Sequence, residues 1–307
     1  MGGGSSRMII SVSKRTDIPA FYGEWFLNRL DAGYCMVRNP KGKPYRVSLK
    51  REDVDGFVFW TKNISPFMGA LATVYRRGYP FYVLYTINNY PKSIEPNVPP
   101  AEKSIQWMHE LKDKYGPNAA VWRYDPIIVT RKPPNVWHLE NFRKLAEALA
   151  RATNEVVISF ADITCYGHVQ RNMAGINWLE LATEEKITMA GQLASIAKEY
   201  GMQLTMCCER GVQPEGTRPS HCVDAGRMGQ VALRPIVAKI TGTRPGCECF
   251  FNRDIGDYDT CLHGCKYCYA TTDNCLAKRL HGAHDAHGDM LIPLVEGSDT
   301  DRVGEVG

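Results

Sequence analysis

The stretch GFVFWTKNISPFMGALATVYRRGYPFYVLYTINN (56–89) decides the fold. Its two ends, 56–63 and 79–89, are apolar runs rich in aromatic and β-branched residues, which is typical of buried strands. Between them, 65–78 begins with Ser-Pro and stops at a glycine, the usual limits of a helix. Two apolar strands joined by one helix predict a parallel pair with the helix packed across it.

The same alternation continues on both sides of this unit. Further strands are predicted at 8–13, 119–129, 154–162 and 202–209, and helices at 23–33, 101–116, 135–153 and 183–201. Six β–α steps in this order predict an α/β protein with a parallel sheet. Polar residues follow each strand, and in a barrel such strand ends converge on one mouth. We therefore expect a partial (β/α)6 TIM-like barrel over residues 8–210.

The composition is that of an ordinary globular protein. The chain has 307 residues, of which 44% are hydrophobic and 23% charged, with a net charge of +4. These values exclude a disordered or fibrous protein. No apolar run approaches the ~18 residues of a membrane helix, so no membrane association is expected. A mildly basic chain without a long basic run leaves nucleic acid open as a partner.

The two ends of the chain are expected to lie outside the folded part. Residues 1–7 lack the apolar core of a signal peptide and are interpreted as a tag or disordered lead, so a cytoplasmic protein is expected. Residues 281–307 are rich in His, Gly and Asp and predict a flexible tail. The intervening residues 211–280 are dense in Gly, Pro and Cys, and predict a loop-rich segment packed on the barrel mouth.

Eleven cysteines stand out, nine of them between Cys207 and Cys275. In an intracellular chain, clustered thiols more often bind metal than form disulfides. The stretch DTCLHGCKYCYA (259–270) has the spacing C-x3-C-x2-C. Three thiolates so placed can hold three irons of a [4Fe–4S] cluster and leave the fourth iron open to a small molecule. A zinc site completed by Cys247 or Cys249 is the alternative.

A second group of thiols comes from separate loops. Its members are Cys207 or Cys208, Cys222, Cys247 and Cys249. Four thiolates would close a second [4Fe–4S] cluster, and buried free thiols are the alternative interpretation. Because side chains alternate along a strand, only one of Cys207 and Cys208 is expected to face the mouth.

The three-cysteine spacing, with Tyr267 just before the third cysteine, resembles the cluster signature of radical S-adenosylmethionine (SAM) enzymes. The resemblance implies a β/α barrel and a cluster whose open iron binds SAM. It also implies reductive cleavage of SAM to a 5′-deoxyadenosyl radical, oxygen sensitivity and a reductant such as flavodoxin or ferredoxin. In most of that superfamily the motif follows the first strand, whereas here it lies beyond the sixth. For SAM to meet the strand ends, the cluster loop is expected to lie over the carboxyl ends of the first and sixth strands, within reach of Lys14, Arg15 and Glu209.

A closer resemblance covers nearly the whole chain. The stretches SVSKRTDIPAFY (11–22), GFVFWTKNISPF (56–67), RYDPI (123–127), HCVD (221–224) and PGCECFFNRDIGDYDTCLHGCKYCYA (245–270), with the cysteine-acid pair at 207–209, are similar to a bacterial family, domain of unknown function 1848. This resemblance implies a radical SAM-type barrel with a displaced cluster motif. The family also resembles spore photoproduct lyase in broad outline.

The resemblance to radical SAM enzymes implies that SAM binds where the strands end. An Arg or Lys suits its carboxylate and an acidic side chain suits its ribose. The candidates for these roles are Lys14, Arg15, Asp17, Arg123, Asp125, Asp162 and Glu209. The alternative is that they form salt bridges at the mouth without a ligand. The substrate and the catalytic residues are not identified.

Two other functions remain open at this point. The chain could be an iron–sulfur or zinc protein that binds or senses without turnover. It could also use SAM differently and transfer an aminocarboxypropyl group, which leaves methylthioadenosine in place of 5′-deoxyadenosine.

Overall fold

The computed structural model describes residues 7–39, 41–130, 135–209 and 211–293. Eight strands form one parallel sheet in the order β10-β1-β4-β5-β6-β7-β8-β9. The strands are β1 (Met8–Val12), β4 (Val54–Thr61), β5 (Phe81–Thr86), β6 (Ala120–Ile127), β7 (Glu155–Phe160), β8 (Gln203–Met206), β9 (Thr217–Pro219) and β10 (Asn252–Asp254). All six strands expected from the sequence are present. The sheet does not close into a barrel within the described residues, because its edge strands β9 and β10 do not pair with each other.

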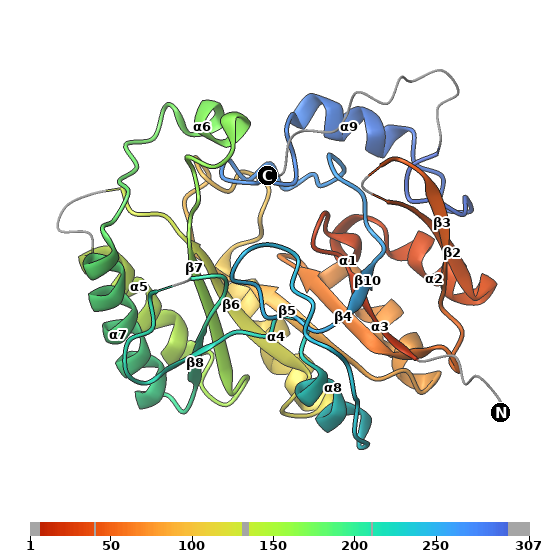
Figure 1. Ribbon diagram of the computed structural model, residues 1–307, viewed down its shortest axis with the longest axis horizontal. Helices are drawn as coiled ribbons and strands as arrows, with labels where there is room; N and C mark the ends of the chain where they lie inside the picture. Colours follow the sequence, from red (N-terminus) through yellow and green to blue (C-terminus); the bar gives the residue numbers. More distant parts are fainter. Residues whose placement is uncertain (1–6, 40, 131–134, 210, 294–307) are drawn as a thin grey trace.

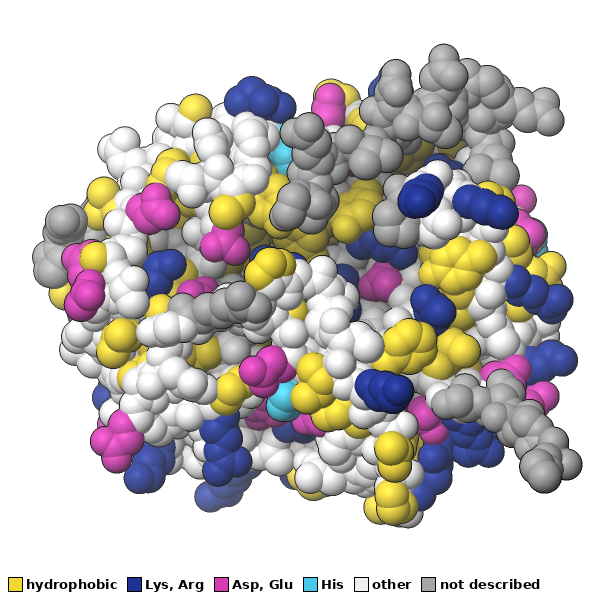
Figure 2. All heavy atoms as spheres, in the orientation of Figure 1, with side chains coloured by type: hydrophobic (Ala, Val, Ile, Leu, Met, Phe, Trp, Pro, Cys, Tyr) yellow, Lys and Arg dark blue, Asp and Glu magenta, His cyan; other side chains and the backbone are white. Residues whose placement is uncertain are grey.

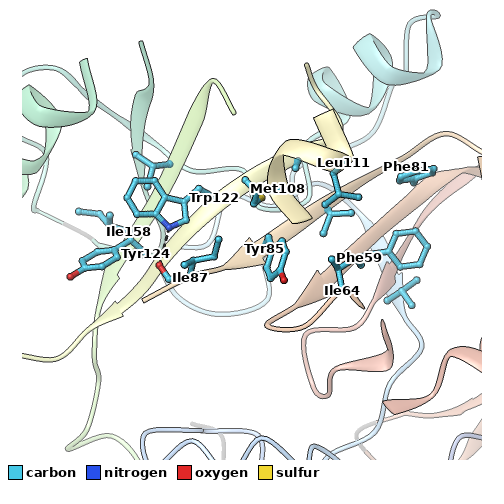
Figure 3. Packing of buried hydrophobic residues seen from close by; sticks show 14 of the residues in the cluster. Phe59, Ile64, Phe81, Tyr85, Ile87, Met108, Leu111, Trp122, Tyr124 and Ile158 are labelled. Atoms are coloured by element: carbon cyan, nitrogen blue, oxygen red, sulfur yellow. Dashed lines mark hydrogen bonds between the residues drawn. The ribbon is translucent and has the colours of Figure 1, made fainter. Parts of the chain in front are cut away.

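One face of the sheet is covered by helices (Figure 1). They are α2 (Gly23–Ala32), α3 (Met68–Arg76), which continues the 3-10 turn η1 (Ser65–Phe67), α4 (Ala101–Tyr115), α5 (Asn135–Ala148) and α7 (Thr183–Glu199). Alternate strand residues such as Phe59, Tyr85 and Trp122 pack against these helices in the main core (Figure 3). The predicted helices are confirmed, since their apolar stripes meet the apolar face of each strand.

The opposite face of the sheet, called here the inner face, carries the other alternate residues. At the amino-terminal half of the strands, Val58 and Tyr82 pack against α8 (Ala225–Ala232) and the chain around Cys222. At the carboxyl-terminal half, the inner face turns polar, as the sequence predicted. The segment 211–280 therefore covers this face and also supplies β9 and β10, so it belongs to the same sheet as residues 8–210.

Gly56 marks the closest approach of α8 to the sheet. A Cβ there would lie 2.2 Å from the Met228 sulfur and 2.7 Å from the backbone oxygen of Pro80. We expect Gly56→Ala to lower the free energy of unfolding by about 1–3 kcal/mol, because the backbone oxygen cannot move aside as a side chain can. Urea unfolding measures this. Gly69→Ala is the control: it lies in α3 with nothing within 4 Å of its added Cβ, so it should not destabilise.

Several elements were not predicted. They are the hairpin of β2 (Tyr34–Arg38) and β3 (Pro44–Ser48), and the helices α1 (Ile18–Phe21), α6 (Gly167–Met173), α8 and α9 (Asn274–Gly282). The flexible tail expected from His281 also needs correction for residues 281–293. This part is tied to α2 by hydrogen bonds from Trp25 Nε1 to the oxygen of Gly288 (3.0 Å) and from Arg29 to the oxygen of His287 (2.9 Å). Residues 1–6 of the predicted lead and 294–307 of the tail lie outside the described residues.

Among the helices of the described residues, none has the length and apolar character needed to cross a membrane.

Candidate functional site

The three-cysteine loop (residues 259–270) follows β10 and lies over the carboxyl ends of β1, β4 and β5. His263 Nε2 lies 2.7 Å from Asp17, which follows β1. The Tyr269 hydroxyl donates to the oxygen of Lys14 (2.8 Å), and the nitrogen of Asn97, beyond β5, donates to the oxygen of His263 (3.1 Å). The sequence predicted a position over strands one and six. The position over β1 is confirmed, but the loop then turns toward β4 and β5 rather than toward β8, the sixth predicted strand.

The thiols of Cys261, Cys265 and Cys268 face one another closely enough to interact electrostatically. No hydrogen bond joins them to each other in the described part of the chain. Burial raises the pKa of the Cys265 thiol to about 12, so a bare thiol there stays protonated at neutral pH. Three sulfur donors held apart on one loop fit a cluster that uses three protein ligands. No group of three His, Cys, Asp or Glu side chains in the described ranges is placed to hold a metal ion.

A buried ion pair flanks this loop. Lys62, at the end of β4, lies 2.9 Å from Glu95. The Tyr267 hydroxyl also donates to Glu95, and the Asn88 amide donates to Glu95 (3.1 Å) and to Tyr267 (3.3 Å). Burial alone would raise the pKa of Glu95, but Lys62 and these donors hold it below its ordinary value. Glu95 is therefore a carboxylate that locks Tyr267, and with it the loop, onto the sheet.

The predicted SAM-binding residues that follow β1 are already engaged within the chain. Asp17 accepts from Thr61 Oγ1 (3.1 Å), the nitrogen of Lys62 (2.8 Å) and His263. Arg15 pairs with Asp254 at 3.1 Å. Asp17 thus holds the three-cysteine loop against the end of β1, and Arg15 holds β10 there. Lys14 differs, since its Nζ is buried and has no hydrogen-bond partner among the described residues.

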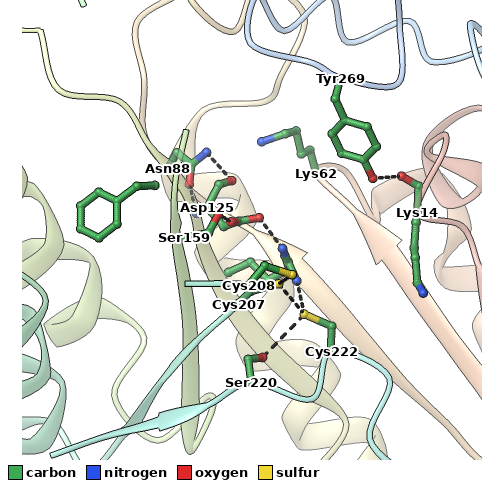
Figure 4. A network of polar contacts seen from close by, with 12 residues as sticks. Lys14, Lys62, Asn88, Asp125, Ser159, Cys207, Cys208, Ser220, Cys222 and Tyr269 are labelled. Atoms are coloured by element: carbon green, nitrogen blue, oxygen red, sulfur yellow. Dashed lines mark hydrogen bonds and ion pairs between the residues drawn. The ribbon is translucent and has the colours of Figure 1, made fainter. Parts of the chain in front are cut away.

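The predicted residues from the later strands gather on the inner face (Figure 4). Arg123 pairs with Asp125, and Asp125 accepts from the Ser159 hydroxyl. The Asn88 amide donates to the oxygen of Asp125 (3.1 Å), which joins this group to Tyr267. The other two acids lie at the rim.

At that rim, Asp162 lies 3.5 Å from Arg244 and is about half exposed. Glu209 accepts from the nitrogen of Phe160 (2.7 Å). Burial raises the pKa of Glu209 above its ordinary value.

Five cysteines meet below Asp125 in one ring, called here the five-thiol ring. Its members are Cys207, Cys208, Cys222, Cys249 and Cys247. The sulfur of Cys207 lies 3.7 Å from that of Cys208 and 3.6 Å from that of Cys222. The expectation that only one of Cys207 and Cys208 faces the site is wrong. Cys208 has φ +61°, and this left-handed turn breaks the alternation of an extended strand.

A pocket of about 240 Å³ opens between Cys247, Glu209 and the end of β8. Figure 2 shows acidic and basic side chains intermingled on the face that carries this segment, without one continuous basic patch. The nucleic-acid interpretation left open by the sequence gains no support from this face.

The family model for "Domain of unknown function (DUF1848)" matches residues 9–270. The chain belongs to the DUF1848 family. No curated protein matches this DUF1848 chain. A solved structure described as a putative alpha-L-fucosidase from Bacteroides thetaiotaomicron VPI-5482 is similar at 14% identity and a TM-score of 0.32, covering 91% of the DUF1848 chain and 96% of the other.

Sequence reasoning missed several residues of the site. Lys62 stood in a polar strand end without a stated role, and Glu95 and Asn97 lie in a loop with no motif around them. Asp254 precedes the three-cysteine loop in a stretch that carries no charge pattern. Only the three-dimensional contacts assign these residues to the site.

Proposed function

We propose that this protein is a radical SAM-type enzyme built on a partial β/α barrel. The observation that carries the proposal is the place of β10. Counted across the sheet rather than along the chain, β10 is the first strand, and the three-cysteine loop follows it. In the superfamily that the motif resembles, the cluster loop follows the first strand. The three-cysteine motif is late in the sequence, but its loop still follows the first strand of the sheet.

The three sulfurs of the loop would hold a [4Fe–4S] cluster. When bound, such a cluster would supply the electron, taken from an external reductant, for cleavage of the sulfonium–C5′ bond of SAM to methionine and 5′-deoxyadenosine, with the hydrogen atom drawn from the substrate. Asp17 and Glu95 hold the loop in position through His263 and Tyr267. Arg123, Asp125, Asp162 and Glu209 are the proposed SAM-binding side chains, since they line the same face.

The test uses the full chain, purified without oxygen and reconstituted with iron and sulfide. With dithionite in place of flavodoxin or ferredoxin, SAM should yield 5′-deoxyadenosine, measured by liquid chromatography. Methylthioadenosine as the product would replace the proposal with aminocarboxypropyl transfer. If the protein holds its cluster and forms neither product, the result would indicate binding or sensing without turnover.

A further inference from the structure

We infer that the five-thiol ring holds a second polynuclear iron–sulfur centre, with Cys207, Cys222, Cys247 and Cys249 as its ligands. The inference concerns a site separate from the three-cysteine loop, and it stands whether or not SAM is the substrate.

The fold gathers these thiols from three segments of the chain. Cys207 directly follows β8, Cys222 precedes α8, and Cys247 and Cys249 lie before β10. Cys222 and Cys249 are buried, at 2% and 3% exposure. Convergence of four thiols from separated segments, each in contact with the next, requires a folded inner face rather than a local turn.

The turn before Cys247 is shaped to bring its thiol inward. Gly242 has φ +57°, and a Cβ there would lie 2.4 Å from the backbone oxygen of Cys247. A side chain at this position would push the chain away from the ring, so the glycine permits the close approach.

Hydrogen-bond donors and positive charge surround the sulfurs. Arg123 Nη1 donates to Cys222 (2.9 Å), and Arg244 Nε donates to Cys208 (3.1 Å). Lys14 Nζ and Trp60 Nε1 are both buried without a partner among the described residues, and the ammonium lies 6.0 Å from the Trp60 ring. Lys14 also acts electrostatically on Cys249.

Buried donors without partners are costly to a fold. A centre with four thiolates is an anion whose sulfurs accept such hydrogen bonds, so it would offer acceptors to Lys14 and Trp60. Trp60 and Lys14 thereby point to an anionic occupant, as Arg123 and Arg244 do.

Cys208 is assigned as the fifth, non-ligating thiol. Without it, the contacts from Cys207 to Cys222, Cys249 and Cys247 still form an unbroken run of four. Cys208 lies in the left-handed turn at the rim, where Arg244 already binds its sulfur.

The experiment counts iron and sulfide in chains purified and reconstituted without oxygen from ferrous iron and sulfide. The wild-type chain should hold about eight irons, and the triple variant Cys261→Ala/Cys265→Ala/Cys268→Ala should keep about four. Cys222→Ser and the less buried Cys247→Ser should each lose about four irons. Cys208→Ser should keep all of them, as should the control Cys35→Ser, whose thiol lies in the main core.

Failure here can be told apart from failure of the proposed function. A triple variant that binds no iron overturns the second centre and leaves the first intact. One zinc per chain in the triple variant, or a disulfide between Cys207 and Cys222 in protein kept free of oxygen, also overturns it. A wild-type chain with about four irons that the triple variant retains supports the second centre and removes the first. Circular dichroism identifies any variant that fails to fold, and the triple variant decides the question in that case.

Discussion

Cys265→Ala is expected to abolish formation of 5′-deoxyadenosine from SAM while leaving the protein folded. Cys265 is one of three sulfurs on the loop, and two thiolates cannot hold a [4Fe–4S] cluster in place of three. The sheet should remain, because its core packs on the helix side and does not include the loop. Product is measured under reducing, oxygen-free conditions, and the fold by thermal unfolding followed by circular dichroism.

The matched control is Cys275→Ala, an exposed thiol in α9. It should keep full product formation and full iron content. Undiminished 5′-deoxyadenosine from the Cys265→Ala protein would remove the three-cysteine loop from the reaction.

Asp254→Ala should lower the free energy of unfolding by about 3–5 kcal/mol, the usual loss when one partner of a buried pair is removed. The carboxylate accepts from Ser11 Oγ (2.8 Å), Ser13 Oγ (2.5 Å), the nitrogen of Lys14 (2.7 Å) and Arg15 Nε (3.1 Å). Its removal leaves these donors and the Arg15 charge without their acceptor. Guanidinium unfolding measures the effect, and the exposed Asp113→Ala in α4 should change stability by less than about 0.5 kcal/mol.

The same residue makes stability depend on pH. Burial opposes ionisation of Asp254, but Arg15 and the donors around it hold its pKa below the ordinary value. Its contribution is therefore complete above the ordinary pKa of Asp and is lost as the pH falls toward the lower, folded-state pKa. The Asp254→Ala protein should show a smaller loss of stability on acidification than the wild type. Equal slopes for the two proteins would show that Asp254 does not carry this dependence.

The six predicted strands could be recognised because each is a continuous apolar run, as expected of strands buried on both faces. The edge strands β9 and β10 could not, since each has three residues and neither shows an alternating pattern. The sequence therefore predicted only six strands in a partial barrel. The chain adds two short strands, one at each open edge of the sheet. Strand-end polarity correctly placed Arg123, Asp125 and Cys207 on one face.

The sequence alone could not predict which side chains of the site pair with one another. Charge at a strand end does not say whether Arg15 meets a ligand or Asp254, which lies 239 residues away. Four members of the five-thiol ring were predicted as a group, but only one of Cys207 and Cys208 was expected to face it. The left-handed backbone conformation of Cys208 depends on tertiary contacts, and the residue types at 207–209 do not predict it.

The position of β10 has a consequence for how the protein is made. During translation, residues 8–209, which supply nearly all of the main core, leave the ribosome before Asn252. The sheet can then pack on its helices before β10 has been added at the edge beside β1. Both sets of thiols are complete only after this strand has docked. Loading of the proposed clusters would therefore follow the docking of β10, on a chain whose core has already formed.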